Sequence, residues 1–158
     1  MGLNYVKKSK YSVDDLLMTN RIVSSEPKNN NELINNWTKF KFANYLDVDS
    51  QYGPITNLKN FKNRLYYFQD SAVGIASVNE RSLITDNNPG ALVLGTGDIL
   101  SRFDYIVDHN GSSIVNDNSI INSNFNLYWY DFDKNVICQI GAGFQELSKT
   151  KNGQSYLR

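Results

Sequence analysis

Apolar residues lie in short runs of four to seven positions, separated by Gly, Asn, Asp and Lys, along most of the chain. Within the runs β-branched and aromatic residues dominate, which is typical of pleated, half-buried strands. Short strands bounded by turn residues predict an antiparallel all-β fold. The runs that carry this prediction are 55–61, 65–68, 73–78, 91–94, 103–107, 127–132 and 136–140.

One strand pattern occurs twice. Leu65-Tyr66-Tyr67-Phe68-Gln69-Asp70 is matched 62 positions later by Leu127-Tyr128-Trp129-Tyr130-Asp131-Phe132, and each copy is followed by a β-branched run. Because Leu65 to Ile75 and Leu127 to Ile137 both span ten positions, the two hairpins are expected to share one register. Repeated meanders are typical of propellers and stacked sheets, since one unit cannot bury both of its apolar faces. The pattern predicts a partial β-propeller-like region.

Aromatic residues occupy both faces of these two strands. Successive side chains of a strand point to opposite sides, so each face carries apolar residues and each strand should be covered on both sides. These aromatic residues are therefore the candidates for packing or interface contacts. An exposed Tyr or Trp that stacks on a carbohydrate is the functional alternative. The candidates are Tyr66, Phe68, Tyr128, Trp129 and Tyr130.

Other local patterns predict turns, a further strand and a boundary. Lys39-Phe40-Lys41-Phe42 alternates charged and aromatic residues, which predicts a strand exposed on one side. Lys62-Asn63 and His109-Asn110-Gly111 follow strand-like runs and predict hairpin turns. Residues 1–37 read as an irregular segment with short helices, and 38–158 as the β-repeat region.

Charge and composition exclude some classes of function. Sixteen basic and sixteen acidic residues give no net charge, and they are interspersed, so no basic stripe indicates specific nucleic-acid binding. No apolar run approaches the roughly 20 residues of a membrane-spanning helix. The 22 Asn residues are expected in turns, although an AT-rich genome explains their number equally well.

Candidate chemistry is sparse. Asp131-Phe132-Asp133-Lys134-Asn135 starts like a calcium loop, but its sixth position is Val136 and its twelfth Ala142, where Gly and Glu are required. A hairpin turn is the better interpretation, and paired carboxylates at Asp131 and Asp133 are the weakest hypothesis for catalysis. Gly95-Thr96-Gly97 lacks the residues of a phosphate loop and indicates a bend between strands.

His109 and Cys138 are the remaining candidates for chemistry. His109 is the only histidine and is expected to be exposed at a turn. Cys138 is the only cysteine and lies in an apolar run, so a buried thiol is expected. No catalytic residue, metal site or cofactor is therefore predicted, and the chain is not expected to be an enzyme.

Several segments together resemble the tail muzzle, or nozzle, protein of crAss-like short-tailed bacteriophages, which is also called a stabilization protein. The matching stretches are Phe40–Asp49, Leu65–Asp70, Val78–Ile84, Leu94–Gly97, Leu127–Asp131 and Leu147–Lys149. The similarity extends from about residue 20 to the C-terminus. These stretches are short sequence patterns and not catalytic signatures.

The resemblance implies a non-enzymatic structural section of a virion tail, made in the host bacterial cytoplasm. Its implied partners are further copies of itself in a ring and other phage tail proteins. Members of the family are many times longer, so the chain looks like one section whose sheet edges need partners. The alternative is a glycan-binding, propeller-like module for host adsorption, with a host-surface glycan as its partner.

Overall fold

A computed structural model describes residues 17–27, 33, 35–78, 82–84, 92–94, 99–114 and 117–157. Strands predominate, as the sequence predicts, and all strand pairs are antiparallel. The short strands outside the two main sheets are β1 (Arg21–Val23), β2 (Tyr45–Asp47), β6 (Ser82–Ile84) and β7 (Leu92–Leu94). The helical elements are η1 (Asn36–Thr38), η2 (Ser50–Tyr52), η3 (Asp117–Ser119), α1 (Leu147–Thr150) and η4 (Gln154–Tyr156).

Two four-stranded meanders form the body of the molecule. The first sheet has the order β3-β4-β5-β8 and the second the order β12-β11-β10-β9. The first sheet consists of β3 (Ile55–Phe61), β4 (Arg64–Gln69), β5 (Val73–Val78) and β8 (Leu100–Val107). The second consists of β9 (Ile120–Asn122), β10 (Leu127–Asp131), β11 (Val136–Ile140) and β12 (Phe144–Glu146).

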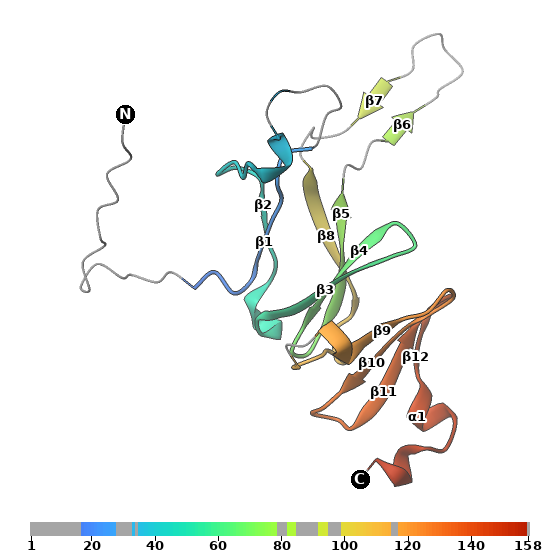
Figure 1. The fold of residues 1–158 in the computed structure, drawn as a ribbon. Coiled ribbons are helices and arrows are strands. Elements are labelled where there is room, and N and C mark those ends of the chain that lie inside the picture. The colour runs from blue at the N-terminus through green and yellow to red at the C-terminus, as the bar shows by residue number, and fades with distance from the viewer. Residues whose placement is uncertain are drawn as a thin grey trace, which may run out of the picture.

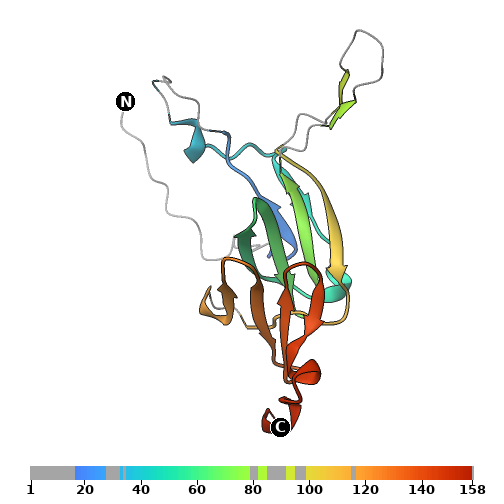
Figure 2. The ribbon, with the colours of Figure 1, turned by 90° about the vertical axis from the view of Figure 1, so that its right-hand side faces the viewer.

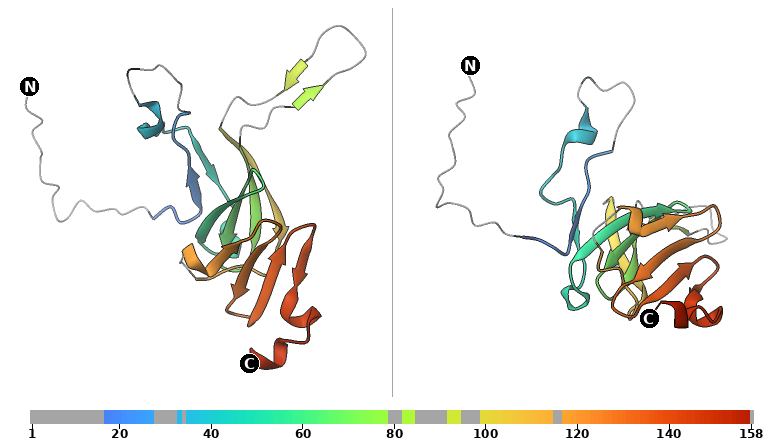
Figure 3. Two further views of the ribbon diagram at one scale, coloured as in Figure 1. Left: turned by 45° about the vertical axis from the view of Figure 1, so that its right-hand side comes forward. Right: turned by 60° about the horizontal axis from the view of Figure 1, so that its bottom comes forward.

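Three layers stack on one another (Figure 1). The β1–β2 hairpin covers one face of the first sheet, and the second sheet covers the other. The two sheets lie against each other in Figure 2 and Figure 3, with the C-terminal helices beyond the second sheet. The β6–β7 hairpin interrupts the first sheet between β5 and β8 and projects from the end far from the second sheet.

Each interface between layers has its own apolar core. The core between the sheets includes Phe68, Leu127 and Trp129. The core under the β1–β2 hairpin includes Ile22 and Tyr67. Strand β4 therefore contributes alternate residues to two cores, which confirms the prediction that it is a central strand covered on both faces.

The turn chemistry explains why β3 and β4 pair. Lys62 and Asn63 both adopt positive φ, 49° and 61°, which fits the right-handed twist of a two-residue hairpin. The predicted turn at this position is confirmed. The second sheet has a four-residue loop after β10, since Asp131 pairs with Val136.

The two copies of the sequence repeat become equivalent strands, but their registers differ. β4 and β10 are the second strands of their meanders, and β5 and β11 are the third. Leu65 pairs with Ala76, whereas Leu127 pairs with Ile140. The prediction of one shared register is therefore wrong, because the loop of the second hairpin starts one residue later. A shift of two in pairing leaves every side chain on its original face.

Two local predictions are also wrong. Residues 39–42 form no strand, and Phe40 and Phe42 are exposed in the loop before β2. Asn110-Gly111 makes no hairpin turn, because residues 110–114 are not in a strand and both residues are buried. Gly111 instead lies so close to the first sheet that an added Cβ would come within 2.3 Å of the Gln69 carbonyl oxygen.

Two expectations lie partly or wholly outside the described residues. These are the irregular segment with short helices over 1–37, of which 1–16, 28–32 and 34 are not described, and the bend at 95–97. The described part of 1–37 contains strand β1 and the beginning of the short η1. The described residues form no closed barrel or propeller.

Candidate interaction surfaces

Aromatic rings fill the space between the two sheets. The rings of Phe68 and Trp129 meet edge to face, with centroids 5.5 Å apart and an interplanar angle of 71°, a favoured geometry for aromatic pairs. On the other side of Trp129, the ring of Phe144 from β12 lies 6.0 Å away. The sheets are thus joined by a packed core and do not merely touch.

The structure separates the five predicted interface residues into two groups. Tyr66, Phe68 and Trp129 are buried between the sheets. Tyr128 and Tyr130 are half-buried on the opposite face of the second sheet. Trp129 is only 2% exposed, so it offers no platform on which a carbohydrate could stack.

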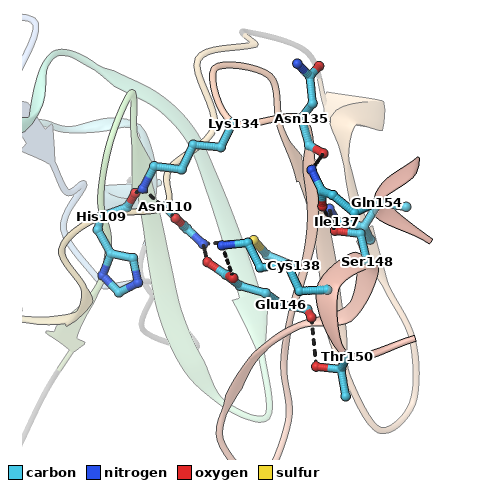
Figure 4. A network of polar contacts seen from close by, with 11 residues as sticks. His109, Asn110, Lys134, Asn135, Ile137, Cys138, Glu146, Ser148, Thr150 and Gln154 are labelled. Atoms are coloured by element: carbon cyan, nitrogen blue, oxygen red, sulfur yellow. Dashed lines mark hydrogen bonds and ion pairs between the residues drawn. The ribbon is translucent and has the colours of Figure 1, made fainter. Parts of the chain in front are cut away.

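A network of polar contacts, which we call the polar joint, lies at the end of the inter-sheet core next to β12 (Figure 4). Asn110, which follows β8 of the first sheet, donates to Glu146 Oε1 at 2.7 Å and to Cys138 Sγ at 3.4 Å. Lys134, from the β10–β11 turn, donates to Asn110 Oδ1 at 2.8 Å and to the His109 carbonyl. Asn110 is fully buried, and its side-chain amide is satisfied by Glu146, Cys138 and Lys134, which all belong to the second sheet or to its β10–β11 turn.

The Glu146 carboxylate of the joint is also paired with a lysine at the rim. Lys149 of α1 lies 2.5 Å from Glu146 Oε2. The hydrogen bond from Lys149, and then that from Asn110, lowers the pKa of Glu146. Burial raises the pKa of the Cys138 thiol to about 12, so this cysteine is the inert buried thiol that the sequence predicts.

The opposite end of the inter-sheet core is joined by hydrogen bonds to the backbone. Asn122 of β9 donates to the carbonyl of Asn60 in β3 at 3.0 Å. Thr56 and Asn57 of β3 donate to the carbonyls of Ser112 and Ile114, at 2.6 Å and 2.7 Å. The edge strand β3 is therefore held against the segment that leads from the first sheet into the second.

Sequence patterns give no indication that two polar residues, Gln69 and Asn110, are buried. Gln69 reads as a polar turn residue, yet it is fully buried and donates to the carbonyls of Asp49 and Gly53 at 2.8 Å and 2.7 Å. Its Oε1 accepts from the Tyr105 hydroxyl at 2.9 Å. No local pattern marks Gln69 or Asn110 as buried, because their partners lie 16 to 36 positions away.

We call the exposed apolar side of the second sheet the outer face; it is formed by Ile121, Tyr128, Tyr130 and Ile137. Tyr128 pairs with Ile121 across β10 and β9, and Tyr130 pairs with Ile137 across β10 and β11. These four side chains therefore point to the same side. The Tyr128 hydroxyl accepts from Asn126 at 3.0 Å and the Tyr130 hydroxyl donates to Asn135 at 2.6 Å, which fixes both rings.

A second exposed apolar surface lies at the other end of the stack of layers. We call it the hairpin end; it is formed by Val23 and Tyr45 on the β1–β2 hairpin and by Trp37, Phe40 and Phe42 in the loop between its strands. Glu26 stabilises this loop, because its carboxylate forms an ion pair with Lys41 at 3.0 Å and accepts a hydrogen bond from the Asn44 side chain at 2.6 Å.

The carboxylates considered for chemistry serve the β10–β11 turn. Asp131 is buried, and its Oδ1 accepts from the backbone N–H of Lys134 at 3.1 Å. Burial raises the pKa of Asp131, an effect that this hydrogen bond opposes. Asn135 takes a positive φ of 52°. The hairpin-turn interpretation of this segment is therefore confirmed.

In the described ranges, no group of three or more His, Cys, Asp or Glu side chains could hold a metal ion. No described helix is long and apolar enough to cross a membrane. His109 is exposed, as predicted, and its Nδ1 lies 2.8 Å from Asp108 Oδ1.

The fold and these surfaces define an all-β class of protein: two stacked β-meanders with exposed apolar residues at each end. A family model for the Crassvirus muzzle protein matches residues 3–158, essentially the whole chain. The chain therefore belongs to the Crassvirus muzzle protein family, which places it among the structural proteins of a phage tail. A search of curated proteins gives no match.

Proposed function

We propose that this chain is a non-enzymatic section of a phage tail that packs with neighbouring subunits through its β-sheets. Family membership supports the role in the tail. The observation that supports packing is the outer face, where two exposed isoleucines and two fixed, half-buried tyrosine rings lie on one side of the second sheet. Contiguous exposed apolar patches mark protein interaction sites in soluble proteins.

The arrangement of the sheets supports a propeller-like order. Two consecutive four-stranded meanders are stacked face to face, which is how neighbouring blades of a propeller pack. The first strands of the two sheets lie next to each other, since Asn122 of β9 donates a hydrogen bond to Asn60 of β3. The polar joint brings the end of β8 to β12, the fourth strands of the two sheets. We infer that each meander acts as one blade and that further blades come from neighbouring copies in a ring.

The test is the state of the protein in purified particles and in solution. Cross-linking mass spectrometry of virions should recover peptides of this chain linked to further copies of itself and to other tail proteins. Native mass spectrometry of the purified chain should show oligomers that increase with concentration. A chain that is absent from particles, or that stays monomeric at every concentration, would contradict the proposal.

Glycan binding at the host surface is the alternative function, and one observation limits it. Of the three aromatic side chains on β10 only Tyr128 and Tyr130 reach the outer face, and their hydroxyls already bond to Asn126 and Asn135. A glycan array is the measurement that separates the two functions. Saturable binding to a glycan that Tyr128→Ala abolishes would favour the alternative.

A further inference from the structure

The order of the layers leaves apolar residues uncovered at both ends of the stack. The first sheet is covered on both faces, by the β1–β2 hairpin and by the second sheet. Val23 and Tyr45 point away from the first sheet, since their strand neighbours Ile22 and Leu46 pack into the core against it. The loop that carries the other residues of the hairpin end continues from these strands on the side far from the second sheet (Figure 1). The hairpin end and the outer face cannot meet within one chain.

The outer face continues the stacking pattern that is already present between the two sheets. Tyr66 and Phe68 of β4 point toward the second sheet and are buried by it. Tyr128 and Tyr130 stand 62 positions later, on the equivalent strand β10, and point away from the first sheet. The positions of β4 that the second sheet covers are thus equivalent to positions of β10 that no further sheet in the described part of this chain covers.

The exposed rings of the hairpin end would supply a large part of the area of an interface. Tyr45, Trp37, Phe40 and Phe42 are 38%, 51%, 64% and 92% exposed. At about 200 Å² for each aromatic side chain, these rings leave about 500 Å² uncovered. Stable interfaces bury about 800 Å² per partner, so the rings alone supply more than half of that area.

Charges next to the hairpin end would not oppose its burial. Arg21 is paired with Asp47 at 2.6 Å, and its guanidinium lies 3.8 Å from the centre of the Tyr45 ring. Lys41 is paired with Glu26. Covering this surface would therefore bury charges that are already paired, which costs less than burying isolated charges.

We propose that the outer face of one copy binds the hairpin end of the next copy, so that copies associate head to tail. This inference rests on the proposed function and names the partner of the outer face. A symmetric contact between two outer faces would leave both hairpin ends uncovered, and the reverse holds for two hairpin ends. Among contacts between two copies of this chain, only the head-to-tail contact covers both surfaces, and such contacts generate rings or open filaments.

Two variants of the full chain test the proposal by complementation. The first, Ile121→Asp with Ile137→Asp, places charges on the outer face. The second, Phe40→Asp with Phe42→Asp, places charges on the hairpin end. All four residues are exposed, so both variants are expected to fold, which far-UV circular dichroism and thermal unfolding check. Phe125→Asp, at an exposed position between β9 and β10, is the matched control.

Each variant alone should be monomeric by sedimentation velocity, because each lacks one half of the contact. Their equimolar mixture should form a one-to-one heterodimer and nothing larger, since only one intact pair of surfaces remains. The control should associate like the unmodified chain. Homodimers of either variant, or a mixture that stays monomeric while the unmodified chain associates, would overturn the head-to-tail contact but not the proposed function. A monomeric unmodified chain would overturn both.

Discussion

Gly74 of β5 packs against the side chain of Tyr67, its cross-strand partner in β4. A Cβ added at Gly74 would lie 2.2 Å from the Tyr67 hydroxyl oxygen and 2.3 Å from its Cζ. Tyr67 is fully buried, and the rings of Phe103 and Tyr105 meet it edge to face at 6.3 Å and 5.7 Å. The ring therefore has no space into which it can move, and the substitution must shift the strand or displace the ring.

We expect Gly74→Ala to lower the free energy of unfolding by about 2 kcal/mol. Overpacking a well-packed core costs about 1–3 kcal/mol. A contact near 2.2 Å belongs at the upper end of that range. Replacing Gly by Ala in regular structure returns roughly 0.5–1 kcal/mol. Urea unfolding followed by tryptophan fluorescence measures the difference, at protein concentrations low enough to keep the chain monomeric.

Gly143→Ala is the matched control for this prediction. An added Cβ at Gly143 would meet no atom within 4 Å, so the free energy of unfolding should change by less than about 0.5 kcal/mol. If Gly74→Ala were as stable as the unmodified chain, the packing of Tyr67 under the β1–β2 hairpin would be wrong. If both variants were equally destabilised, the loss would not report on this contact.

Three further predictions concern the polar joint. Asn110→Ala should lower the free energy of unfolding by about 1–3 kcal/mol, because Glu146 and Lys134 lose a buried partner; thermal unfolding that matches the unmodified chain would contradict this. The pKa of Glu146 is lowered in the folded state. Its contribution to the free energy of unfolding is therefore complete above its unfolded pKa of about 4.3 and is lost as the pH falls below that value. Glu146→Gln should then reduce the loss of stability measured between pH 5 and pH 3, each about one unit from that value. Cys138, buried and with a raised pKa, should react with a thiol reagent only after unfolding, and rapid labelling of the native chain would refute its burial.

Local turn chemistry made much of the first sheet predictable. Lys62-Asn63 tolerates the positive φ of a tight hairpin turn, and the strand-like runs on both sides of it become β3 and β4. The aromatic pattern of β4 also predicted burial on both faces, which the two cores confirm. In β10 the pattern alone could not show that Tyr128 and Tyr130 remain on an outer surface.

Long-range contacts account for the predictions that failed. Asn110-Gly111 has the local chemistry of a hairpin turn, but Asn110 is bound by Glu146 and Lys134 of the second sheet. Residues 39–42 alternate like a strand, yet Glu26 ties Lys41 and Asn44 into a loop. In both places a side chain distant in sequence decides the backbone conformation, and no sequence window of strand length contains it.

The central claim is that the outer face is covered in the assembled protein. Hydroxyl-radical footprinting of Tyr128 and Tyr130, in the dilute chain and in its concentrated, assembled form, tests it most directly. The account predicts that labelling of both tyrosines falls on assembly while labelling of Phe125 stays constant. Equal labelling of Tyr128 and Tyr130 in the two states would contradict it.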